Sequence, residues 1–245
     1  MKHKKIIIFF LLIIFVYLIY YFNHDTKITY LALGDSLSVG IDSNGNTNYG
    51  YSNHLANYLK GQDNLNYYTN AFSSTTARID DLLYNLEINQ IITTNNKKIS
   101  LKKCLQDADL ITLSIGMNDL LADLTLSTTS VDNLSNEEIT TISDSITKDL
   151  EKLFKEIRKY CKKQIIFLNY YNPYMTSSPS LDRLFTYINN NTEQLTVKYN
   201  IDYIDIYTPF KNNKSYLSNP TNIYPTTTAY SFIANKIIEK HLSNK

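Results

Sequence analysis

The sequence has no tryptophan and only six glycines, five prolines and two cysteines among its 245 residues. Positive and negative side chains almost balance, 24 against 23, so the formal net charge is +1. With so small an excess, and no basic stripe interleaved with aromatic residues, there is no electrostatic reason to expect nucleic-acid binding. The hydrophobic content of 43% is sufficient for one domain with a sizeable core.

The two cysteines, Cys104 and Cys161, lie far apart in the chain. Outside the cytoplasm they could form a disulfide, but two separated cysteines do not establish one. Neither has a histidine at the spacing that zinc ligands adopt. We therefore expect no zinc site and no metal or other cofactor.

A single long apolar run is present, and it lies near the N-terminus. It extends from Ile6 to Phe22 behind three lysines, and its seventeen residues would span about 26 Å as a helix, just enough to cross a bilayer core. The lysines favour a cytoplasmic N-terminus, which places the remainder outside. We predict a cytoplasmic tail (1–5), a single-pass plasma-membrane anchor (6–22), a linker (23–27) and an extracytoplasmic domain (28–245).

A cleaved signal peptide is the alternative to this anchor, and it would make the protein secreted. The apolar region of a signal peptide is usually shorter than this run. No small-x-small cleavage site follows Phe22, and no cysteine is there to accept a lipid. These features favour the uncleaved anchor.

The rest of the chain alternates β-prone apolar runs with segments of helical period. The predicted strands are Ile28–Leu33, Leu65–Thr69, Leu110–Ile115, Ile165–Leu168 and Ile201–Ile206. The clearest predicted helix has six apolar residues spaced by three and four between Ile139 and Ile157, with a capping box of Ser135 and Glu138 at its start. Two more helices are predicted around 181–195 and 230–237, and 124–136 is predicted to be a polar loop. Runs too apolar to be half-exposed favour a parallel sheet covered by helices on both faces.

Two short motifs follow predicted strands, at the edge of the sheet where ligands bind in such folds. Gly34-Asp35-Ser36-Leu37 resembles the first block of the GDSL, or SGNH, hydrolase family, and Gly116-Met117-Asn118-Asp119 resembles its third block. The segment 70–76 lies where the second block would fall, and Tyr171-Asn172-Pro173-Tyr174 is similar to membrane-anchored bacterial members. The resemblance covers the chain from about residue 28 and implies a flavodoxin-like SGNH hydrolase fold, a three-layer α/β/α sandwich with a five-stranded parallel sheet.

The resemblance also implies acyl transfer, with Ser36 as the nucleophile that attacks an ester carbonyl. The oxyanion would be met by the backbone N–H groups of Ser36 and Ser74 and by the side-chain amide of Asn118. The family usually has glycine where this chain has Ser74. In this reading Gly34, Asp35, Gly116 and Asp119 are supporting residues.

The last family block, an aspartate and a histidine three residues apart and followed by proline, is altered in this chain. Pro225 sets the register, so that Thr221 stands at the aspartate position and Tyr224 at the histidine position. Neither side chain is a base near neutral pH. Of the histidines that the chain does contain, His54 is expected to lie in the helix after the first block. We do not expect it to replace the missing base.

Two functional interpretations therefore stand. In the first, the protein is a tethered hydrolase of acyl or acetyl esters of lipid or envelope glycan, with catalysis weakened by the missing pair. In the second, it is an inactive member of the family that binds an acylated ligand or acts as a membrane-tethered scaffold. Neither the substrate nor the oligomeric state follows from the sequence.

Overall fold

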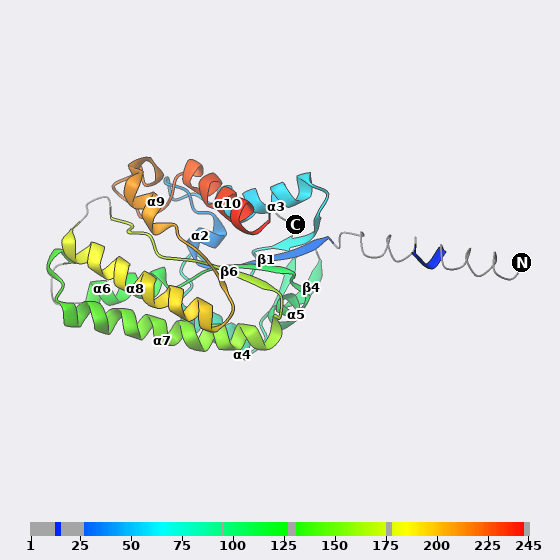
Figure 1. Ribbon diagram of the computed structural model, residues 1–245, viewed down its shortest axis with the longest axis horizontal. Coiled ribbons are helices and arrows are strands. Elements are labelled where there is room, and N and C mark those ends of the chain that lie inside the picture. The colour runs from blue at the N-terminus through cyan, green and yellow to red at the C-terminus, as the bar shows by residue number, and fades with distance from the viewer. Residues whose placement is uncertain (1–12, 16–26, 95, 127–130, 175–177, 243–245) are drawn as a thin grey trace, which may run out of the picture.

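The computed structural model describes residues 13–15, 27–94, 96–126, 131–174 and 178–242 (Figure 1). Of the predicted anchor only residues 13–15 fall within these ranges, where they are helical. None of the helices in the described ranges has the length and hydropathy needed to cross a membrane.

Five strands form one parallel sheet in the order β2-β1-β5-β6-β7, which confirms the predicted flavodoxin-like arrangement. The strands are β1 (Ile28–Gly34), β2 (Leu65–Thr69), β5 (Leu110–Ser114), β6 (Gln164–Leu168) and β7 (Asp202–Ile204). The central strand β5 is buried along its whole length, and β1 is buried from Tyr30 onward. This burial explains why the runs are apolar without alternation.

Helices cover both faces of the sheet (Figure 1). Helices α3 (Tyr51–Gly61) and α10 (Thr227–His241) pack together on one face. On the other, α4 (Ile79–Glu87), α5 (Leu101–Asp107) and α8 (Pro179–Lys198) pack around α7 (Asn136–Tyr160). The other helices of the described ranges from residue 27 onward are α2 (Ser36–Val39), α6 (Met117–Leu126), α9 (Tyr207–Asn212), η1 (Val131–Asn133) and η2 (Lys214–Tyr216).

Helix α7 illustrates how local sequence sets an element's limits. Ser135 accepts a hydrogen bond from the backbone N–H of Glu138, and the Glu138 carboxylate accepts one from the backbone N–H of Ser135. This is the predicted capping box. The predicted apolar stripe, which includes Ile146, Leu150 and Leu153, is buried against the sheet.

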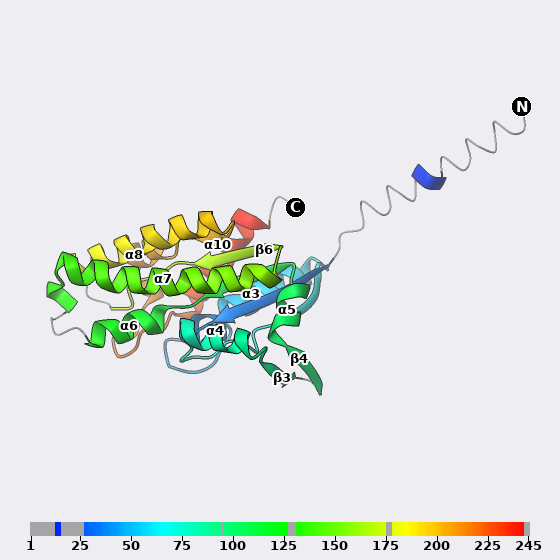
Figure 2. The same ribbon diagram turned by 90° about the horizontal axis from the view of Figure 1, so that it is seen from below.

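Two details differ from the sequence prediction. The predicted loop over 124–136 is shorter, because α6 continues to Leu126 and η1 occupies 131–133. A two-stranded antiparallel hairpin, β3 (Ile91–Thr94) and β4 (Lys97–Ser100), was not predicted. It projects beside α5 near the start of β1 (Figure 2).

The hydrophobic core is self-contained within the domain. Every residue of the core described by the structure lies between Tyr30 and Leu242. Cys104 and Cys161 are both free thiols, and Cys161 is buried within this core. A chain from residue 27 onward therefore carries the whole core, with no disulfide needed to close it.

Shortening a buried side chain at the centre of α7 tests how this helix packs on its face of the sheet. Leu150 is fully buried, so Leu150→Ala should lower the free energy of unfolding by about 2–5 kcal/mol through lost burial and a residual cavity. Urea denaturation of residues 27–245 measures the change. Lys155→Ala, on the exposed side of the same helix, should change stability by less than about 0.5 kcal/mol. Equal losses in the two variants would contradict this arrangement.

Candidate active site

The first motif is positioned by a close approach of two neighbouring strands. Gly34 ends β1 with φ of 138°, and a Cβ added there would lie 1.7 Å from the carbonyl oxygen of Ser114 on β5. The backbone N–H of Asp35 donates to that same carbonyl at 2.8 Å. Only glycine fits at this position, and the contact directs the chain out of the sheet at Asp35.

Ser36 is the first residue of the four-residue helix α2. Asp35 caps this helix, because its carboxylate oxygen Oδ1 accepts from the backbone N–H of Leu37 at 3.1 Å. The Ser36 side chain is half-buried, and its hydroxyl makes no hydrogen bond to any residue that the structure describes. The predicted nucleophile therefore stands at the carboxyl end of β1 without a base attached to it.

Asp35 has an unusual environment for a carboxyl group. It is 3% exposed, and burial raises its pKa to about 7, although hydrogen bonds from Leu37 and Ser114 act in the opposite direction. The Ser114 hydroxyl contacts Asp35 Oδ1 at 3.3 Å and the Ser38 hydroxyl at 2.9 Å. A carboxyl group that titrates near neutral pH therefore lies directly beside the nucleophile.

A buried network of hydroxyl groups ends at Asp35. The network joins five hydroxyls to the Asp35 carboxyl and the Leu33 carbonyl: those of Ser38, Ser114, Tyr51, Thr112 and Tyr30. The Ser114 hydroxyl donates to Asp35 Oδ1, and the Ser38 hydroxyl donates to the Leu33 carbonyl.

The third motif fastens the loop that follows β2. The Asn118 side-chain amide donates to the carbonyl oxygens of Thr75 at 3.2 Å and Ala77 at 2.8 Å. Asp119, whose pKa burial raises, accepts from the backbone N–H of Ile79 at 3.2 Å. The structure thus brings the two segments together as the sequence indicates, but it directs both amide hydrogens of Asn118 into the loop.

The backbone N–H of Ser74, another predicted oxyanion donor, is also hydrogen-bonded within the chain. The backbone N–H of Ser74 donates to the carbonyl oxygen of Gly34 at 3.1 Å, while its side chain is exposed. Next to it, the Ser73 hydroxyl donates to the carbonyl oxygen of Ala32 at 3.1 Å. In this conformation Ser74 joins the loop to the end of β1 instead of presenting a donor to a ligand.

Thr221 and Tyr224 lie in the segment before α10. Thr221 is exposed, and both its backbone N–H and its hydroxyl donate to the side-chain oxygen of Asn219. The backbone N–H of Tyr224 donates to Asn222 Oδ1 at 3.0 Å. The side-chain amides of both asparagines donate to the Ser43 carbonyl at 2.7 Å, which attaches this segment to the loop after α2.

Tyr224 and Thr221 have no contact with Ser36 among the hydrogen bonds that the structure describes. Within the described ranges no hydrogen bond joins the two hydroxyls, and no carboxylate binds the Thr221 hydroxyl. His54 lies on α3, where its ring contacts Tyr49 edge-on at 4.7 Å and burial lowers its pKa. The structure therefore places no base on Ser36 among these candidates.

The space next to Ser36 is small. A cavity of about 20 Å³ adjoins it, lined by Asp35, Ser36, Leu37, Ser114, Ile115, Met117, Leu168, Asn169, Tyr170 and Tyr171. Tyr171 donates from its hydroxyl to the Ile223 carbonyl at 2.9 Å, so it connects this cavity to the segment that holds Tyr224.

The described side chains contain no group of three histidines, cysteines or carboxylates that could hold a metal ion.

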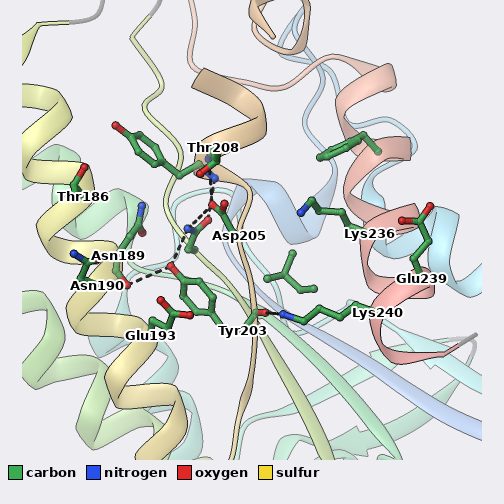
Figure 3. Close-up of a pocket in the computed structure, with 14 residues that line it drawn as sticks. Thr186, Asn189, Asn190, Glu193, Tyr203, Asp205, Thr208, Lys236, Glu239 and Lys240 are labelled. Carbon is green, nitrogen blue, oxygen red and sulfur yellow. Dashed lines mark hydrogen bonds between the residues drawn. The ribbon is translucent and has the colours of Figure 1, made fainter. Parts of the chain in front are cut away.

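A larger cavity lies elsewhere, along the edge strand β7 between α8 and α10 (Figure 3). Its volume is about 760 Å³, and Glu193, Asp205 and Lys240 are among its polar lining residues. Asn169 lines both cavities, and the sequence did not identify this residue as part of a site. It is 4% exposed and accepts from the backbone N–H of Ile206 at 2.7 Å. A polar residue directly after a buried strand was the available signal.

Comparison with known proteins relates this geometry to a family. The model of the GDSL-like lipase/acylhydrolase family matches residues 30–237. No curated protein matches the sequence.

Several solved structures share the fold. The lipase Lip_vut3 from a goat rumen metagenome is 23% identical, with a TM-score of 0.69 over 86% of this chain and 95% of its own. Axe2, an acetylxylan esterase from Geobacillus stearothermophilus, is 16% identical, with a TM-score of 0.63 over 87% and 94%. A G-D-S-L family lipolytic protein from Veillonella parvula is 18% identical, with a TM-score of 0.59 over 86% and 97%.

The buried carboxyl of Asp35 predicts a specific pH dependence of stability. Its folded pKa of about 7 lies above the unfolded value of about 3.9, so its stabilising contribution is complete below about pH 4 and is lost as the pH rises through about 7. Asp35→Asn keeps the acceptor oxygen and removes the titration. The stability of wild type relative to the variant should fall by up to about 4 kcal/mol between these pH values.

Urea denaturation across this pH range measures the difference. Asp63→Asn, at an exposed aspartate, serves as the matched control and should show no comparable trend. A pH-independent difference between wild type and Asp35→Asn would show that Asp35 is ionised throughout.

Proposed function

The chain belongs to the GDSL-like lipase/acylhydrolase family, and we propose that it is an ester hydrolase that attacks acyl or acetyl esters with Ser36 and turns over slowly. The observation that carries this proposal is the position of Ser36, half-buried at the end of β1 with an unengaged hydroxyl beside a cavity. The fold it shares with a lipase and an acetylxylan esterase supports an ester substrate from lipid or glycan.

Slow turnover follows from the missing base. With Thr221 and Tyr224 in the last block, no side chain there accepts the Ser36 proton near neutral pH. Loss of the histidine in a serine hydrolase lowers turnover by about 10⁶-fold, and the remaining rate comes from oxyanion stabilisation and binding. A residual esterase activity is therefore the expected level.

A second candidate function is ligand binding without catalysis, as an inactive family member or a tethered scaffold. The hydrogen bonds of the Ser74 N–H and the Asn118 amide favour it, because both groups are already satisfied by carbonyl oxygens of the chain. An oxyanion would have to displace these bonds before it could be stabilised.

We further propose that the domain is held outside the plasma membrane by the apolar run from Ile6 to Phe22. The support for this tether is the length of the run and the lysines that precede it.

Hydrolysis of a short-chain chromogenic ester by residues 27–245 separates the two functions. We expect slow hydrolysis that Ser36→Ala removes, because the nucleophile is lost. Ser73→Ala, which removes a serine hydroxyl that donates to the Ala32 carbonyl, is the control and should retain activity. Equal rates in wild type and Ser36→Ala would exclude Ser36 chemistry and leave the binding function.

Restoring the family's last block should raise the rate if only the base is missing. We expect Thr221→Asp combined with Tyr224→His to increase kcat by about 10²–10⁴-fold, the usual contribution of general acid–base catalysis. The same pair of changes combined with Ser36→Ala should stay inactive. No gain from the double variant would mean that the engaged oxyanion donors also limit the reaction.

A further inference from the structure

The two ends of the parallel sheet carry opposite charge. The strand-start end is formed by the segments that lead into the parallel strands and by the β4–α5 region, which are residues 27, 60–64, 97–109, 158–163 and 198–202. Together these segments contain eleven lysines and arginines and four aspartates. The opposite end is formed by the segments that follow the strands, which are residues 35–50, 70–78, 115–126, 169–174, 178–182 and 205–227. Together these segments contain three lysines and arginines and six aspartates. A protein with a net charge of +1 thus has a basic end, at the strand starts, and an acidic end, around Ser36.

A cleft opens at the basic end between the edge of the sheet and the β3–β4 hairpin. Its volume is about 480 Å³, and its lining is mostly apolar. Tyr67 on the edge strand β2 and Ile91 on the hairpin are 40% and 63% exposed at this cleft. Exposed apolar groups of this size, gathered at one cleft, indicate a contact surface.

Lysines surround this cleft. Lys98 and Lys103 line it, and Lys97 is the next residue along the hairpin. Lys103 pairs with Asp107 at 2.6 Å, whereas Lys97 and Lys98 form no ion pair with any residue that the structure describes. An apolar cleft with cationic side chains at its rim matches an amphiphile with acyl chains and an anionic headgroup.

The chain enters the domain at this same end. Residues 1–26, with the apolar run from Ile6 to Phe22, precede Lys27 at the start of β1. The five residues 23–27 reach at most about 17 Å when extended, so a tether would keep the strand starts near the bilayer. The seven residues of β1 then hold Ser36 about 20 Å farther out.

We propose that the β2/β3–β4 cleft and its lysines form a binding surface for anionic phospholipid, which seats the strand-start end of the domain on the membrane. The hairpin inserts its apolar side chains among acyl chains while Lys97 and Lys98 contact headgroup phosphates. Seated in this way, the domain presents Ser36 away from the bilayer, toward envelope glycan esters. The orientation rests on the proposed tether, whereas the lipid surface belongs to the domain itself.

Vesicle sedimentation of residues 27–245 tests this surface without the apolar run. We expect binding to vesicles that contain phosphatidylglycerol, weaker binding as salt is raised, and little binding to pure phosphatidylcholine. Lys97→Glu with Lys98→Glu should lower the partition coefficient more than about tenfold, since each lysine near an anionic surface contributes about 1 kcal/mol. Lys211→Glu with Lys214→Glu makes the same charge change at the acidic end and should retain binding.

A second pair of variants tests the apolar contact. Ile91→Asp should remove binding, while Leu126→Asp, at an even more exposed apolar residue of α6, should not. Thermal melts confirm that each variant is folded. No preference for anionic vesicles, equal losses in both lysine pairs, or retained binding in Ile91→Asp would each overturn the proposal. Ester hydrolysis by the same preparations, measured without vesicles, reports on Ser36 separately.

Discussion

The contact between Gly34 and the carbonyl of Ser114 is the constraint on which the site depends. It brings the ends of β1 and β5 together closely enough that a side chain has no room. The chain must then leave the sheet at Asp35, which buries its carboxyl among hydroxyls and starts α2 at Ser36. The loop after β2 is fixed to the same point through the Ser74 N–H and the Gly34 carbonyl.

This close packing has consequences for chemistry. Burial favours the neutral form of Asp35, although the Ser114 hydroxyl donates to its carboxyl group. The same compactness satisfies the Asn118 amide and leaves only a small cavity beside the nucleophile. The arrangement stabilises the fold around Ser36, but a substrate must open part of it before the oxyanion can be bound.

The parallel direction of the strands divides the molecule into two functional ends. The five parallel strands start at one end of the sheet, whose segments carry eleven lysines and arginines. The same strands finish at the other end, where α2 begins at Ser36 and α6 contains Asn118. The proposed lipid surface and the candidate nucleophile therefore lie at opposite ends of the sheet.

The sequence alone determined the five strands, the capping box of Ser135 and Glu138 and the family of the fold, because burial on both faces and local hydrogen bonding leave patterns in consecutive residues. It did not reveal the β3–β4 hairpin, whose four-residue strands owe their position to packing beside α5. Only the tertiary structure decided that Asp35 is buried, that the Ser74 N–H meets Gly34 and that Tyr224 makes no bond to Ser36. These outcomes depend on contacts between segments far apart in the chain, which no local pattern records.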